Sequence, residues 1–143
     1  MSNFSSFFKD SALKLENKKI VVSERFKDSK GKPEKWEIRP LSFREVTQLR
    51  AESQKKTSIK AGKRSASIDI PDDDKFRLKF AAAATVYPDL HDKALQDSYG
   101  AKGAEALLTE MLTSAEMDDY TDIVQQVSGY DMGLEDKVAE AKN

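Results

Sequence analysis

Residues 19–40 read KIVVSERFKDSKGKPEKWEIRP, and the fold class follows from this stretch. Apolar side chains alternate with polar ones on both sides of a central polar segment, at positions Ile20, Val22, Phe26, Trp36 and Ile38. A period of two is typical of half-buried strands. The central residues 28–33, DSKGKP, combine four residue types that favour turns. The stretch therefore predicts a β-hairpin over about residues 18–39.

This hairpin must pack against other elements, because a two-stranded hairpin alone is marginally stable in water. Trp36 is the one tryptophan of the chain, and we expect it to anchor the hairpin in the core. Its exposure as an interaction hot spot is the alternative. The full set of expected structural anchors is Phe26, Trp36, Ile38, Phe80 and Tyr87.

The residues after the hairpin favour helices. Ser42 and Glu45 form a capping box at the start of a helix expected over about 42–56, with Phe43, Val46 and Leu49 in its apolar stripe. A second helix begins after Pro71 with three aspartates, which suit the positive end of a helix dipole. Its apolar face is expected to extend through Phe80 to Tyr87, and Pro88 ends it.

Three more helices are expected in the second half of the chain. A short one covers about 92–99 and ends at Gly100. Residues 104–111 have the apolar spacing of an amphipathic helix. Thr113 and Glu116 form a second capping box, which starts a helix that ends at Gly129.

Other segments lack a helical or strand pattern. Residues 56–71 are rich in Lys, Ser, Ala and Gly and are expected to form a mobile basic loop. The N-terminal Phe4, Phe7 and Phe8 either dock or fray, and residues 131–143 are expected to be a flexible tail. The prediction is one α+β, mainly α-helical domain over 1–130, in which the hairpin packs on a small bundle of about four to five helices.

Composition excludes several classes of protein. The chain has 143 residues, no Cys and one His, which removes disulfides, thiolate metal sites and multi-histidine sites. The longest apolar run, residues 80–87, is far shorter than the roughly 20 residues of a membrane span. The start of the chain lacks a basic segment followed by an apolar one, so we expect no secretory signal. A cytoplasmic protein without catalytic activity, cofactor or metal is expected.

Each remaining polar feature has a plain structural explanation. His91 has no neighbouring partner for acid–base chemistry and is interpreted as an exposed or capping residue. The aspartates at 72–74 and at 118, 119 and 122 lack the alternating spacing of a calcium loop. Residues 55–64, KKTSIKAGKR, could meet phosphates, but no aromatic residue is interleaved for base stacking. A solvated basic segment is favoured over a nucleic-acid site.

Charge is divided unevenly along the chain. Residues 1–70 have a net charge of +8 and residues 71–143 one of −9, although the whole chain carries −1. Such a division suits head-to-tail contacts between copies, or partners of opposite charge at the two ends. The alternative is that the halves fold against each other and largely cancel.

Several stretches in this order and spacing resemble one family. They are SERFKD at 23–28, GKP at 31–33, WEIRP at 36–40, ATVYPDL at 84–90, LQDSYG at 95–100 and GAEALL at 103–108. The chain resembles the XkdN-like tail assembly chaperones of contractile-tailed phages, prophages and phage-tail-like particles of Gram-positive bacteria. The resemblance covers roughly residues 10–130 and is weakest in the basic segment and the tail.

The resemblance implies a late protein that is not an enzyme. Such chaperones are thought to bind the long helical tape measure protein, keep it soluble and help tail tube protein assemble around it. A longer form made by ribosomal frameshifting is common in such systems, and would be a further partner. The family implies action in the host bacterial cytoplasm during assembly, and absence from the mature particle.

An unassembled tape measure protein exposes apolar helical stripes, and its chaperone therefore needs an adaptable apolar surface. The sequence-based hypothesis places that surface on residues 103–128. The residues expected to bind the partner are Leu107, Leu108, Met111, Met117, Tyr120 and Val124. The alternative is that the same apolar stripe is simply the core.

Two other functional classes compete with the chaperone. One is a structural tail adaptor or completion protein that stays in the virion, and the other is a small nucleic-acid-binding regulator. The regulator would lose its DNA affinity when Lys55, Lys56, Lys60, Lys63 and Arg64 were neutralised.

Overall fold

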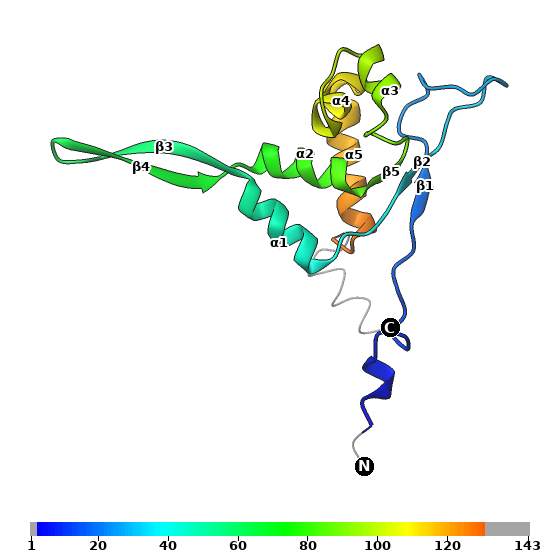
Figure 1. Cartoon of the computed structure of the whole chain (residues 1–143), viewed down its shortest axis with the longest axis horizontal. Coiled ribbons are helices and arrows are strands. Elements are labelled where there is room, and N and C mark those ends of the chain that lie inside the picture. Colours follow the sequence, from blue (N-terminus) through cyan, green and yellow to red (C-terminus); the bar gives the residue numbers. More distant parts are fainter. Residues whose placement is uncertain (1–2, 131–143) are drawn as a thin grey trace.

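A strand pair at the N-terminal end packs on helices, as the α+β prediction requires (Figure 1). The computed structural model describes residues 3–130. In this part of the chain there are five α-helices, a three-stranded sheet and a separate pair of strands. The predicted fold class is confirmed.

The predicted hairpin is present as strands β1 (Lys18–Ile20) and β2 (Trp36–Ile38). They pair antiparallel, with Lys18 opposite Ile38 and Ile20 opposite Trp36. In the turn between them, the Asp28 carboxylate accepts hydrogen bonds from the backbone N–H groups of Lys30 and Lys32, at 2.8 and 3.0 Å. This is the local Asx bonding that makes aspartate favourable in turns.

Helix α2 (Asp73–Ala84) lies at the centre of the molecule (Figure 1). It contacts helix α1 (Phe43–Glu52), helix α4 (Ala104–Met111) and helix α5 (Ser114–Val127). Its alanines Ala81, Ala82 and Ala84 are buried, and side chains this small let neighbouring elements approach closely. Both predicted capping boxes are confirmed, at the starts of α1 and α5. The short helix α3 (Lys93–Ser98) precedes α4.

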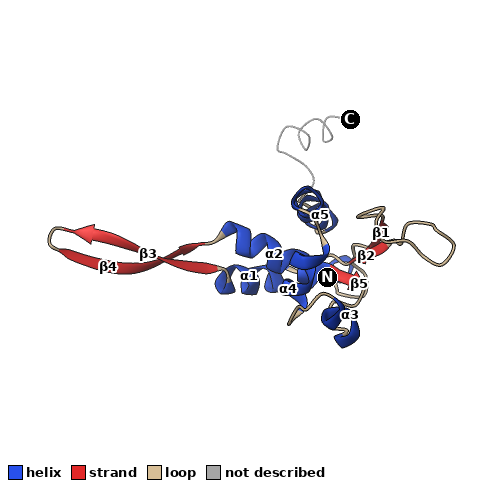
Figure 2. Ribbon diagram, turned by 90° about the horizontal axis from the view of Figure 1, so that it is seen from above, coloured by secondary structure: helices blue, strands red, loops and turns tan. Residues whose placement is uncertain are grey.

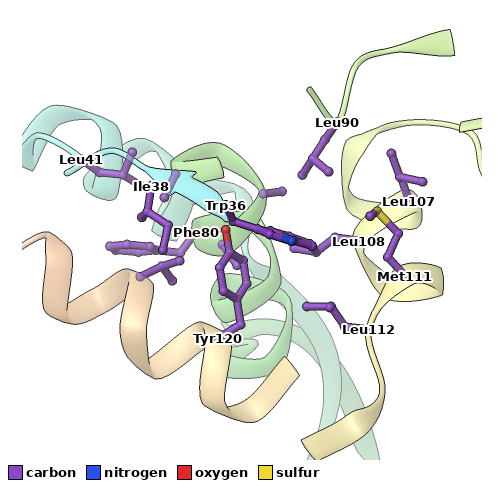
Figure 3. Close-up of a cluster of buried hydrophobic side chains, with 14 of the residues drawn as sticks. Trp36, Ile38, Leu41, Phe80, Leu90, Leu107, Leu108, Met111, Leu112 and Tyr120 are labelled. Atoms are coloured by element: carbon purple, nitrogen blue, oxygen red, sulfur yellow. The ribbon is translucent and has the colours of Figure 1, made fainter. Parts of the chain in front are cut away.

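Trp36 joins the sheet to the helices. Its side chain is 1% exposed, and its ring lies 5.1 Å from the Tyr120 ring in an edge-on arrangement (Figure 3). The Thr85 hydroxyl donates to the carbonyl of Ala81 at 2.7 Å, so the Tyr120 hydroxyl donates to Thr85 Oγ1 at 2.6 Å. Burial raises the pKa of the Tyr120 hydroxyl, which therefore stays protonated.

The prediction of a mobile basic loop at 56–71 is wrong, because this segment forms two paired strands. Strands β3 (Gln54–Ala61) and β4 (Arg64–Pro71) pair along their whole length and form an arm that projects from the helices (Figure 2). Gly62 has φ of 68°, while Lys63 has a negative φ, as in a type II′ hairpin turn. The alternation of Thr57, Ile59 and Ala61 indicates a strand, but the surrounding lysines and serines obscure it.

The predicted continuation of the second helix to Tyr87 is also wrong. Helix α2 ends at Ala84, and Thr85–Tyr87 form strand β5, which pairs antiparallel with β2. Thr, Val and Tyr favour strands, and the edge of β2 supplies the backbone partners. The sheet order is therefore β1-β2-β5.

The predicted first helix is correct at its start and too long at its end. Helix α1 stops at Glu52 instead of about residue 56, because the chain enters β3 at Gln54. Phe43 was expected in its buried stripe, yet its side chain is 86% exposed. As the first residue of the helix it points away from the core, which Val46 enters instead.

The N-terminal phenylalanines do not dock on the core. Residues Ser5–Phe7 form a short 3-10 helix, and Phe4, Phe7 and Phe8 are all exposed. The predicted tail at 131–143 lies outside the described residues. The predicted boundary of the domain at residue 130 therefore stays a prediction.

An ion pair between Arg25 and Glu116 connects the segment after β1 to helix α5. The Arg25 guanidinium donates to both carboxylate oxygens of Glu116 and, at 2.8 Å, to the carbonyl of Met111. Hydrogen bonds from Arg25 and then Ser23 lower the pKa of Glu116 to about 2. Glu45 is similar, because hydrogen bonding by Arg39 lowers its pKa to about 2.

Ala81→Leu should destabilise the protein by about 1–3 kcal/mol, because the larger side chain overpacks the centre of the core. Ala81 is fully buried, whereas Ala106, on helix α4, is exposed and provides the control Ala106→Leu. The measurement is urea unfolding followed by Trp36 fluorescence. Equal stability of the two variants would contradict the central position of α2.

Acid should destabilise the protein between about pH 4.5 and pH 2. The pKa values of Glu45 and Glu116 are lower in the folded chain than their ordinary value of 4.5, so the unfolded chain takes up protons first. Glu116→Gln should be less stable than the wild type at pH 7 and lose less stability over that range. Glu110→Gln, an exposed change on α4, is the control. Parallel pH profiles for wild type and Glu116→Gln would disprove the ion pair's contribution.

Candidate partner-binding site

Five of the six residues expected to bind a partner lie in the core. Leu107, Leu108, Tyr120 and Val124 have 0% exposure and Met111 has 5%, whereas Met117 is partly exposed between α2 and α5. Met117 is therefore the most exposed member of the set. Their role in binding a partner stays a prediction.

The expected structural anchors divide into buried and half-exposed residues. Trp36, Ile38 and Phe80 are buried, and Phe26 is partly buried with its ring 6.1 Å from that of Trp36. Tyr87 departs from the expectation, because its side chain is 50% exposed. It belongs to β5 instead of α2, so its ring lies at the molecular surface.

Several of these residues line one apolar pocket. The pocket has a volume of about 170 Å³ and is lined by Glu34 and by six apolar or aromatic residues: Phe26, Trp36, Tyr87, Pro88, Leu95 and Met111. They come from four parts of the chain: the hairpin, β5 with the following Pro88, α3 and α4. The cavity is of the size that takes a benzene-sized group, since an engineered apolar cavity of about 150 Å³ binds benzene.

Local hydrogen bonds position the walls of this apolar pocket. Arg25 holds the C-terminal end of α4 through the carbonyl of Met111, and the next residue, Phe26, forms one wall. The Gln96 side chain donates to the carbonyl of Leu90 at 2.8 Å and joins α3 to the segment before it. Leu95, on α3, is thereby kept in the wall of the pocket. The pocket is preorganised by contacts outside it.

A polar surface adjoins the apolar pocket at Tyr87. A wide depression of about 540 Å³ lies beside the ring and is lined by Lys19, Asp28, Lys32, Pro33, Glu34, Lys35, Glu37 and Tyr87. An apolar pocket surrounded by charged residues is the usual anatomy of a protein interface. The arrangement can hold one apolar side chain of a partner and bond its polar neighbours.

The remaining candidate residues show no site for chemistry. His91 is exposed, and its backbone N–H donates to the Asp89 carboxylate at 3.0 Å. Across residues 3–130, no group of three or more His, Asp or Glu residues could hold a metal ion. No helix in this range is long and apolar enough to cross a membrane.

Comparison with known proteins identifies the family. The model of the phage XkdN-like tail assembly chaperone protein family matches residues 4–142. The chain is 26% identical to the phage-like element PBSX protein XkdN of Bacillus subtilis strain 168, over 99% of this chain and 94% of that protein. It is 25% identical to the uncharacterised protein YqbN of the same strain, over 99% and 93% of the two chains.

The fold agrees with this assignment. The crystal structure of YqbN superimposes with a TM-score of 0.73 at 18% identity, covering 91% of this chain and 98% of that chain. The likeness shows a shared fold. The family's name points to an assembly role and not to catalysis. The chain belongs to the XkdN-like family of phage tail assembly chaperones.

Proposed function

We propose that this chaperone binds the tape measure protein, keeps it soluble and promotes polymerisation of tail tube protein around it. The observation that carries the proposal is the apolar pocket between the hairpin and helices α3 and α4. A tape measure protein presents repeated apolar side chains on helices, and one such side chain fits a pocket of about 170 Å³.

The composition of the pocket supports recognition of many similar helices. Met111 is unbranched and polarisable, so it adapts to side chains of different shape. Tyr87 is half exposed at the mouth, where a rigid aromatic ring contributes contact area at low entropic cost. The charged surface beside it offers hydrogen bonds to polar residues that flank an apolar stripe. Recognition would depend on pattern more than on exact sequence.

The proposal includes further partners and a place of action. Tail tube protein is the second partner, and a frameshifted longer form of the chain is a third. The chaperone would act in the cytoplasm of the host during assembly of a contractile tail and leave before the particle is mature. Finding the chain in purified particles at the level of a structural subunit would favour a tail adaptor instead.

Co-expression with the tape measure protein of the same genome tests the proposal. We expect the tape measure protein to become soluble and to co-purify with the wild-type chain. Tyr87→Thr should weaken binding by about 2 kcal/mol, or about thirtyfold in Kd, as expected for a central aromatic contact. The substitution keeps a residue that favours strands, so β5 should persist.

Val86→Thr is the matched control, because Val86 is the neighbouring residue of β5, is 41% exposed and points to the opposite face. It should bind as the wild type does. Equal binding by the two variants would place the interface elsewhere. A tape measure protein that stays insoluble in the presence of the wild-type chain would contradict the proposed function itself.

A further inference from the structure

The β3–β4 arm has one apolar face and one polar face. In its register, Thr57 lies opposite Ile68 and Ile59 opposite Ala66. Because side chains alternate along a strand, one face carries the apolar set of Thr57, Ile59, Ala61, Ala66, Ile68 and Ile70, with Lys55 at its base and Arg64 near its tip. The other face carries the polar set of Lys56, Ser58, Lys60, Ser65, Ser67 and Asp69. The arm is thus amphipathic.

Nothing in residues 3–130 covers the apolar face of the arm. Ile59 is 44% exposed and Ile68 is 38% exposed. The arm is fixed at its base, where the Asp72 N–H donates to the Ser53 carbonyl at 2.9 Å, and it points away from the helices in both views (Figures 1 and 2). Eight residue pairs at a rise of about 3.3 Å give it a length of about 25 Å. A second molecule is therefore within its reach.

The arm is also strongly basic. It contains one acidic residue, Asp69, and five basic residues: Lys55, Lys56, Lys60, Lys63 and Arg64. A surface that receives it should combine apolar contacts with negative charge.

Such a surface exists between helices α2 and α5. Two adjoining hollows of about 210 and 290 Å³ share Leu78, Met117 and Asp118 in their lining, and together they form the α2–α5 groove. Leu78 and Met117 are partly exposed along it. Asp74 also lines the groove, and the exposed Asp119 and Asp122 continue the acidic side of α5. The Arg77 guanidinium in its wall pairs with Asp122 at 3.1 Å.

We propose that the arm of one copy of this chain docks, apolar face inward, in the α2–α5 groove of a second copy. Ile59 and Ile68 would cover Leu78 and Met117. Lys55 and Arg64, which lie on the same face of the arm as Ile59 and Ile68, would face the aspartates beside the groove. The uneven division of charge along the sequence thereby becomes two complementary surfaces on one molecule.

This contact joins two different surfaces, so each copy keeps a free arm or a free groove for the next. Heterologous contacts of this kind produce rings or open chains. The interface is small and therefore of the weak class. It gains strength when several copies sit on one long partner, because their local concentration is then high.

Sedimentation of the purified full chain over a series of concentrations tests this. The wild type should associate at about 0.05 M salt and dissociate at about 0.5 M, because salt screens the charged contacts. An arm variant, Ile59→Thr with Ile68→Thr, retains residues that favour strands. A groove variant, Met117→Lys, keeps an unbranched stem over the core and repels the basic arm. Each variant alone should associate at least about tenfold more weakly.

Mixing the two variants distinguishes this contact from others. The intact arm of the groove variant fits the intact groove of the arm variant, so the mixture should form a 1:1 dimer and stop there. Val86→Thr is the control on a distant strand and should associate as the wild type does. Trp36 fluorescence should show that each variant keeps its core.

Three results would overturn the proposal. The wild type could remain monomeric at every concentration, the variants could associate like the wild type, or the mixture could fail to recover a dimer. Weaker association of the arm variant, with the groove variant associating like the wild type, would indicate contact between two arms. A monomeric wild type that binds duplex DNA, with affinity lost on neutralising the five basic residues of the arm, would assign the arm to nucleic acid.

Discussion

Burial of Trp36 against helices α2 and α5 is the interaction on which the rest of the structure depends. The hairpin cannot persist alone, and Trp36 is the residue of β2 that meets the Tyr120 ring at 5.1 Å. That contact needs the small side chains of α2, because Ala81 and Ala84 leave room for the sheet to approach. Thr85, just after the end of α2, accepts a hydrogen bond from the Tyr120 hydroxyl and is the first residue of β5. The sheet and the helices thus share one core.

This packing decides which apolar residues remain for partners. Most of the apolar side chains along α4 and α5 are buried in the core. The surfaces that we propose for partners are therefore the apolar pocket at Tyr87, the α2–α5 groove and the arm. The proposed functions of these surfaces are separate: the pocket takes a side chain of the tape measure protein, and the arm and groove join copies of the chaperone. A chaperone built this way would cover a long partner through many weak contacts.

The sequence predicted the hairpin, both capping boxes and the positions of α3, α4 and α5, because each has a strong local signal. It missed the arm, where a Gly62-Lys63 turn and alternating isoleucines lie among lysines and serines that suggest a loop. It also missed β5, since a strand of three residues after a helix depends on the distant edge of β2. The pocket could not be predicted, because Phe26, Leu95 and Met111 are brought together by tertiary packing alone.

The central claim is that the tape measure protein occupies the pocket beside Tyr87. Amide hydrogen exchange of the chain, alone and in complex with the tape measure protein, tests it most directly. We predict slower exchange on binding in residues 24–36 and 85–95, which contain the walls of the pocket. Unchanged exchange in both segments, with slowing elsewhere in a complex that has formed, would contradict it.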